Sequence, residues 1–188
     1  MMKKVLSVLL ILTFVLAMAS LAACGDKKSD DATEAPAERK PDGETYELKD
    51  QDGAYTFSLQ SYKDASLSCK IAPYADRDAL EVASDKGEYK VYVYINNGYR
   101  NNYESKHESG KEDGGVDITV GEYKGYTYPK TVLNAAFIDT GAKVEDESDI
   151  ITMVVEQPQP FTHDINEVIA DQELTDLLAT LTLTKSPV

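Results

Sequence analysis

The stretch from Glu88 to Asn96 (EYKVYVYIN) alternates so regularly that it constrains the fold more than any other part of the chain. A period of two is typical of a β-strand. The face that we expect in the core consists of Tyr89, Val91, Val93 and Ile95. The face that we expect to meet water consists of Lys90, Tyr92, Tyr94 and Asn96. A chain built around this segment must contain a β-sheet.

Other short β-prone runs, separated by turn clusters, predict an antiparallel sheet of about six to eight strands. These runs are residues 44–48, 54–60, 66–71, 79–83, 116–120, 123–128, 133–138 and 149–156. The first two flank Asp52-Gly53 and are predicted to form a hairpin. The last run (DIITMVVE) is apolar on both faces, which predicts a central strand covered by a helix.

One or two helices are predicted to pack against this sheet, which makes the fold class α+β. Residues 98–105 place two tyrosines four positions apart, a weak helical pattern. Asp171 can cap a second helix, whose apolar positions have helical spacing: Leu174, Leu177, Leu178 and Leu181. Asp164 with Glu167 resembles a capping box, so this helix begins sooner or follows a separate turn. The alternation over 180–184 favours a short closing strand.

The chain opens with two methionines and two lysines and then runs without a charge from Val5 to Ala23. This pattern is typical of an export signal, although a helix of about 28 Å is also long enough to span a bilayer. Neither an uncleaved helix nor a secreted product cut after Ala17-Met18-Ala19 would explain the cysteine that follows.

Leu21-Ala22-Ala23-Cys24 resembles the lipobox of bacterial lipoproteins. The resemblance implies a lipoprotein signal peptide over residues 1–23, cleaved between Ala23 and Cys24. It also implies a diacylglyceryl group and an N-acyl chain such as palmitate on Cys24, which would anchor the protein at the extracytoplasmic face of the cell membrane.

Composition divides the remainder into a linker and a domain. Residues 24–45 comprise the cysteine and a flexible acidic linker, because residues 26–45 contain no aromatic or branched aliphatic side chain. Residues 46–188 have the size of one α+β domain. The net charge of -14 repels phosphate backbones and excludes nucleic acid as a partner.

No motif for catalysis or phosphate binding is present in the sequence, so we expect no enzyme and no cofactor beyond the lipid. His107 and His163 lie in polar segments and are expected to be solvated. The acidic run 145–149 is the one calcium candidate, but it lacks the EF-hand spacing and is expected to be a solvated loop without metal. Cys69, the only other cysteine, is expected to be an inert buried residue.

Tyrosine is unusually frequent, with 12 residues and no tryptophan. Four of them could form an exposed aromatic face for sugars or a protein partner: Tyr92, Tyr94, Tyr126 and Tyr128. The alternative is that they reflect β propensity and cross-strand pairing.

The order of elements is similar to that of small bacterial lipoproteins with the PsbP-like fold. The resemblance is carried by an early hairpin, the strand KVYVYIN, the segment VDITVGEYKGYTYPK with Gly121 and Gly125, and the closing ELTDLLATLTLT. It implies an antiparallel sheet packed against helices and no catalytic residues.

These features predict a monomeric, membrane-anchored extracytoplasmic lipoprotein with a non-catalytic binding or adaptor domain. Its partner would be a protein or a cell-wall polymer. An envelope-associated enzyme or accessory factor is the alternative. The solute-binding component of a transporter is disfavoured, because such receptors close two lobes around a ligand and this domain provides one.

Overall fold

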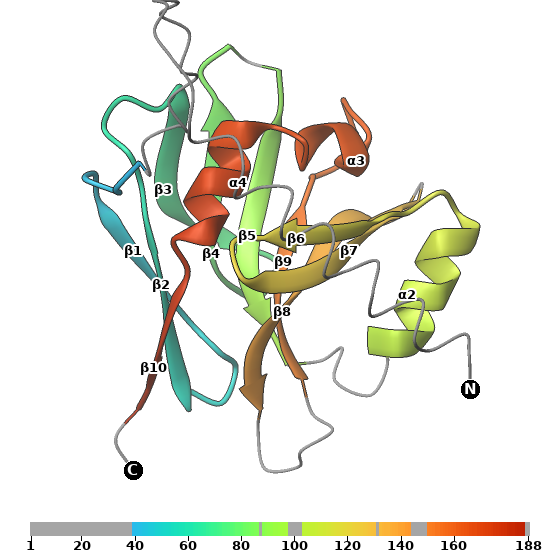
Figure 1. Ribbon diagram of the computed structural model, residues 1–188, viewed down its shortest axis with the longest axis horizontal. Helices are drawn as coiled ribbons and strands as arrows, with labels where there is room; N and C mark the ends of the chain where they lie inside the picture. The colour runs from blue at the N-terminus through green and yellow to red at the C-terminus, as the bar shows by residue number, and fades with distance from the viewer. Residues whose placement is uncertain (1–38, 87, 98–102, 131, 144–149, 187–188) are drawn as a thin grey trace, which may run out of the picture. The chain divides into compact units, whose positions relative to one another are not determined.

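The alternating segment forms strand β5 (Lys90–Asn96) of a seven-stranded sheet in a computed structural model of the protein (Figure 1). The structure describes residues 39–86, 88–97, 103–130, 132–143 and 150–186. Residues Arg39–Val188 form one compact unit, which contains this sheet and a second, smaller one.

The large sheet is antiparallel throughout and has the strand order β3-β4-β5-β9-β8-β7-β6. Its other strands are β3 (Leu67–Tyr74), β4 (Arg77–Ser84), β6 (Asp117–Val120), β7 (Tyr123–Pro129), β8 (Asn134–Lys143) and β9 (Ile150–Glu156). β9 occupies the middle of the sheet, as its apolar sequence predicts.

The smaller sheet has the order β1-β2-β10. Strands β1 (Thr45–Lys49) and β2 (Tyr55–Gln60) form the predicted hairpin, and its turn contains Gly53 at a φ of 69°, which suits glycine. The predicted closing strand is β10 (Thr182–Lys185), which pairs with the other edge of β2.

The main core lies against one face of the large sheet. The layer opposite that face consists of the small sheet together with α3 (Ile165–Val168) and α4 (Gln172–Ala179). Fully buried residues from both layers meet here, among them Phe57, Leu59, Val82, Val93, Ile138, Met153, Ile165, Leu174 and Leu177.

A second, largely aromatic core lies on the opposite face of the large sheet. Its buried members are Ala79, Tyr94, Tyr126, Tyr128, Ala135, Phe137 and Val154. Helix α2 (Tyr103–Glu112) packs against β7 and places Tyr103 edge-on to Tyr126, with ring centroids 5.0 Å apart. Strands β8 and β9 therefore contribute side chains to both cores.

The described residues form three helices, where the sequence predicts one or two. Asp164 and Asp171 cap α3 and α4 respectively, so the predicted capping box belongs to a separate short helix. Helix α2 begins at Tyr103, later than the predicted 98–105, and residues 98–102 lie outside the described part of the chain.

The prediction of a wet face on β5 is wrong for two residues. Val91, Val93 and Ile95 are buried as predicted, but Tyr94 and Asn96 are only 6% and 8% exposed. The reason is the second core, which the alternation of one strand cannot reveal.

Residues 39–44, predicted to belong to the linker, contact the domain. The amide of Gly43 donates to the carbonyl of Ser61 at 2.9 Å, and the Arg39 guanidinium lies 4.3 Å from the centre of the Tyr62 ring. Over the described residues, no helix combines the length and hydropathy needed to cross a membrane.

Candidate functional site

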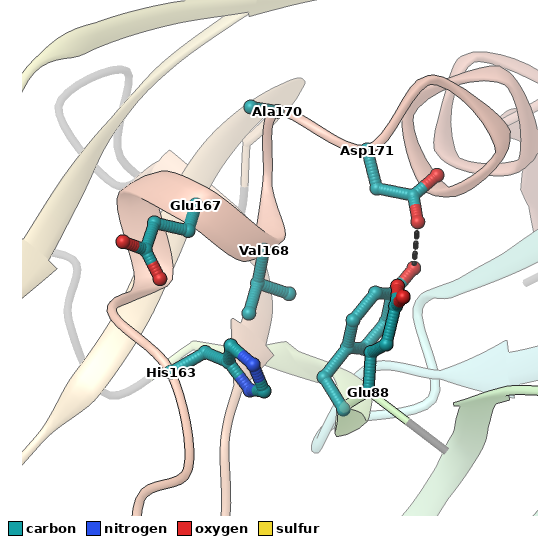
Figure 2. Close-up of a pocket in the computed structure, with 7 residues that line it drawn as sticks. Glu88, His163, Glu167, Val168, Ala170 and Asp171 are labelled. Carbon is teal, nitrogen blue, oxygen red and sulfur yellow. Dashed lines mark hydrogen bonds between the residues drawn. The ribbon is translucent and has the colours of Figure 1, made fainter. Parts of the chain in front are cut away.

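Two adjoining hollows lie beside the connection from β4 to β5 and the segment that follows β9. They share Glu88 and Tyr89 and have volumes of about 280 and 460 Å³; we refer to the pair as the groove. The smaller hollow is lined by Glu88, Tyr89, His163, Glu167, Val168, Ala170 and Asp171 (Figure 2). The larger is lined by Ala83, Ser84, Glu88, Tyr89, Lys90, Gln157, Pro158, Gln159, Pro160 and Thr162.

One wall of the groove is fixed to the start of α4. The Tyr89 hydroxyl donates to Asp171 Oδ2 at 2.9 Å, and Asp171 Oδ1 accepts from the backbone amides of Glu173 and Leu174. Burial, followed by the hydrogen bond to Asp171, raises the pKa of Tyr89 well above its ordinary value. Tyr89 is therefore a neutral hydrogen-bond donor that positions this wall.

Gln157 organises the floor of the larger hollow from a buried position, with 2% of its surface exposed. Its Oε1 accepts from the amides of Thr162 and His163, at 2.8 and 3.1 Å, so the loop after β9 wraps around the side chain. Its Nε2 has no hydrogen-bond partner in the described part of the protein. A buried donor left unpaired costs about 1–3 kcal/mol.

A second buried amide holds the same loop from the other side. Asn134 Nδ2 donates to the carbonyl of His163 at 2.7 Å, and Asn134 Oδ1 accepts from the amide of Ile165 at 2.9 Å. Asn134 thus fixes the backbone at His163 and at Ile165, where the loop enters α3. A groove with a fixed backbone wall loses little entropy when it binds a ligand.

The rim of the groove is acidic. Glu88 and Glu167 are exposed at the smaller hollow, with the half-buried ring of His163 also lining it (Figure 2). Lys90 lines the larger hollow. The surplus of carboxylates favours a ligand that carries an amine or guanidinium group.

The groove does not contain the arrangement expected of a hydrolase. His163 Nδ1 contacts Thr162 Oγ1 at 3.1 Å, but the two are sequence neighbours, and no carboxylate within the described chain orients the imidazole. Likewise, across the described ranges, no group of three or more histidine, cysteine, aspartate or glutamate side chains could hold a metal ion.

The four tyrosines singled out in the sequence do share the second-core face of the sheet, but they do not form an exposed surface. Tyr94, Tyr126 and Tyr128 are 6%, 1% and 9% exposed, so the prediction of exposure is wrong for these three. Tyr92 is half-buried and stacks on Tyr74 with ring centroids 4.1 Å apart. Ligand binding by these residues stays a prediction.

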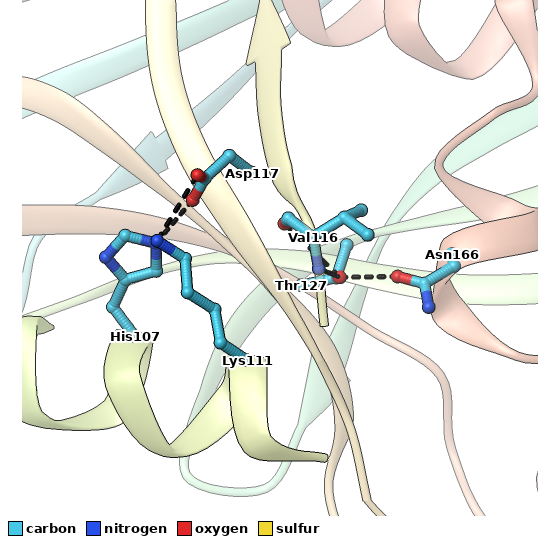
Figure 3. A network of polar contacts seen from close by, with 6 residues as sticks. All are labelled: His107, Lys111, Val116, Asp117, Thr127 and Asn166. Atoms are coloured by element: carbon cyan, nitrogen blue, oxygen red, sulfur yellow. Dashed lines mark hydrogen bonds and ion pairs between the residues drawn. The ribbon is translucent and has the colours of Figure 1, made fainter. Parts of the chain in front are cut away.

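His107 is less solvated than predicted, with 26% of its side chain exposed. Its ring stacks on Tyr126 with centroids 4.8 Å apart, and Nε2 is hydrogen-bonded to the carboxylate of Asp117 (Figure 3). Lys111 Nζ lies 3.4 Å from the same carboxylate. Figure 3 also shows the Thr127 hydroxyl, which accepts from the amide of Val116 and donates to Asn166 of α3.

The remaining predicted residues lie apart from the groove or outside the described residues. Cys69 is half-buried on β3. Ala23, Cys24 and the acidic run 145–149 belong to the part of the chain that the structure does not describe. Gln157, which sequence reasoning missed, is marked in the sequence only by its position between a buried strand and two prolines.

Comparison of the chain with protein-family models, curated proteins and solved structures found no significant match. The proposal of function therefore rests on the groove and on the sequence.

Proposed function

We propose that the protein is a monomeric lipoprotein, anchored through a lipid on Cys24 at the extracytoplasmic face of the cell membrane. Its folded domain acts as a non-catalytic binding module. The ligand is a short peptide segment of a partner protein, which binds in the groove.

The observation that carries the binding role is the unpaired Nε2 of Gln157, a buried side chain that lines the larger hollow. A peptide carbonyl accepts from this donor once the side chain turns to bring Nε2 into the hollow. The two prolines, Pro158 and Pro160, add apolar surface beside this donor. Together they match the requirements of an extended main chain, which needs hydrogen-bond partners and apolar contact along its length.

The acidic rim supports a peptide that carries a basic group. Glu88 and Glu167 would attract a lysine, an arginine or an N-terminal amine, and the negative charge of the whole chain adds to this attraction. A neutral wall polymer would gain nothing from these carboxylates, so we favour the peptide.

The groove is tested by affinity capture from intact cells with the full-length protein and with a Glu88→Lys/Glu167→Lys variant. We expect the variant to retain roughly a tenth or less of the captured protein, since both changes reverse charge at the rim. Glu122→Lys, in the turn between β6 and β7, makes a matched change at an exposed residue that does not line the groove. Equal capture by both variants would show that the groove is not the binding site.

A second variant tests the floor of the groove. Gln157→Leu should weaken binding of the captured partner, while Gln51→Leu, at an exposed glutamine outside the groove, should not. Binding of purified cell-wall fragments that resists all these changes would instead identify a polymer as the ligand.

The anchor is tested separately. Cys24→Ala should release the protein from the membrane fraction or leave it as an uncleaved precursor, because the thiol that carries the lipid is missing. Intact mass and fractionation measure both results. Membrane retention of a processed Cys24→Ala protein would overturn the anchor without affecting the groove.

A further inference from the structure

One edge of β5 is left without a neighbouring strand beside the larger hollow of the groove. On one side, β4 pairs with β5 as far as Lys90, which lies opposite Ala83. On the other side, β9 pairs with β5 only as far as Tyr92, which lies opposite Glu156. The first two residues of β5 therefore extend beyond the end of β9, and Lys90 lines the larger hollow there.

The main chain of Lys90 is directed toward the side that β9 leaves open. The carbonyl of Tyr89 accepts from the amide of Ser84 at 3.1 Å, so the main chain of Tyr89 is directed toward β4. Successive residues of a strand direct their amide and carbonyl groups to opposite sides. The amide and carbonyl of Lys90 are therefore directed away from β4.

The chain that follows β9 does not pair with Lys90. The amide of Gln157 donates to the carbonyl of Asn134 at 3.0 Å, which directs it toward β8 and away from β5. Pro158 comes next and has no N–H, so it cannot donate to the carbonyl of Lys90. Among the described residues, no backbone hydrogen bond joins Lys90 to residues 157–162. A donor and an acceptor of β5 thus border the hollow.

We propose that the peptide binds as an added β-strand, which pairs with Lys90 on the line that β9 leaves at Glu156. The inference rests on the proposed function, because it concerns the same groove. An extended peptide supplies both the carbonyl that the Lys90 amide needs and the N–H that the Lys90 carbonyl needs. Glu88, which lines both hollows, favours a peptide with a lysine or arginine near the paired residue.

Hydrogen exchange of single amides, followed by NMR on the purified full-length protein in detergent, tests this pairing. In the free protein the Lys90 amide should exchange fast. The Val91 amide should exchange slowly, because it is directed toward β4, where Val91 lies opposite Val82.

The probe for binding is the synthetic peptide acetyl-Thr-Val-Lys-Val-Thr-amide, whose residues other than lysine favour an extended chain. We expect a dissociation constant on the order of 1 mM. Near saturation, exchange of the Lys90 amide should slow roughly tenfold, while that of Val91 should not change.

Two substitutions at one position separate the main chain from the side chain. Lys90→Pro removes the amide proton at the first residue of β5, a position where a strand tolerates proline. It should weaken binding of the peptide roughly tenfold. Lys90→Ala keeps the amide and removes a cation that repels the lysine of the peptide, so it should bind at least as tightly as the wild type. If Lys90→Pro does not fold, the exchange of the wild type still decides.

The outcomes distinguish the added strand from the groove itself. If the peptide shifts the signals of Glu88 and Gln157 but does not protect the Lys90 amide, the added strand is overturned and the groove remains the binding site. Equal binding by Lys90→Pro and Lys90→Ala would overturn the added strand as well. A peptide that shifts no signal of the groove up to about 10 mM would overturn the proposed function, and the added strand with it.

Discussion

Cys69 shows at the scale of one residue how its surroundings set the chemistry of a side chain. It lies half-buried on β3 and packs against the main core. Burial, and after it the charges of Asp85 and Glu44, raise the pKa of the thiol to about 11. Because the thiolate is the reactive form, the folded protein keeps Cys69 inert at neutral pH.

Iodoacetamide should therefore alkylate Cys69 slowly in the native protein at about pH 8 and on the order of a hundredfold faster in urea. Mass spectrometry of the peptide that contains Cys69 measures both rates, with glutathione as the reference thiol. Native labelling as fast as that of glutathione would contradict the raised pKa.

Single residues are also where prediction from sequence fails most clearly. The alternation of β5 correctly assigned Tyr94 to the face opposite Val93, but it could not show what covers that face. Tyr94 is covered because Tyr74 and Arg77 approach its ring and its hydroxyl donates to Glu156 at 2.5 Å. Such contacts join residues distant in sequence, so no local pattern encodes them.

At the scale of elements, Asp171 connects a helix to the groove. Asp171→Ala should lower the free energy of unfolding by about 2–4 kcal/mol, because it removes the cap of α4 and leaves the Tyr89 hydroxyl unpaired. Unfolding in urea measures the loss. Asp164→Ala, which removes only the cap of α3, should cost less; equal losses would show that the bond to Tyr89 adds nothing.

The attachment of α2 should depend on pH. The hydrogen bond from His107, and after it the contact with Lys111, lowers the pKa of Asp117 below 3.8, so the charged Asp117 carboxylate stabilises the fold above that pH. The stabilisation is lost as the pH falls through the lower pKa of the folded state. The difference in urea midpoint between wild type and Asp117→Asn should therefore disappear in strong acid.

Asp78→Asn serves as the control for this pH dependence, since Asp78 is an exposed acid on β4. Its midpoints should follow those of the wild type at every pH. A wild-type advantage over Asp117→Asn that persists at about pH 2 would show that the carboxylate charge does not hold α2.

The elements differ in how far the sequence predicted them. Helix α4 has a cap and regular leucines, so its start at Gln172 follows from local chemistry. Helix α2 (YESKHESGKE) has no such apolar stripe. It is held on the sheet by Tyr103, His107 and Lys111, whose partners lie on β6 and β7, and these contacts exist only in the folded protein.

At the scale of the whole molecule, the two cores are joined through the middle of one sheet. Adjacent residues of β8 and β9 point into opposite cores: Phe137 and Val154 into the second, Ile138 and Val155 into the main one. Because the same strands supply both cores, one core cannot unfold while the other stays intact. The domain should therefore unfold as one unit.

Thermal unfolding should then give the same midpoint by far-ultraviolet circular dichroism, which reports the sheets, and by near-ultraviolet dichroism, which reports the buried tyrosines of the second core. Two separated midpoints would show that the cores unfold independently and that residues 46–188 do not behave as one domain.

The α+β class, the first hairpin and the central place of β9 were all predictable, because each depends on local patterns. The sheet order was not, since β5 pairs with β9, which lies more than fifty residues along the chain. The groove depends on that pairing, because it joins residues next to β5 to the loop after β9. For the same reason the floor residue Gln157 could not be predicted.

The order of pairing in the small sheet also constrains when folding can finish. Strand β10 (Thr182–Lys185) is the last strand among the described residues and pairs with β2, near the start of the domain (Figure 1). The small sheet therefore stays incomplete until β10 has been synthesised. If the chain crosses a membrane unfolded, the small sheet can form only after β10 has crossed as well.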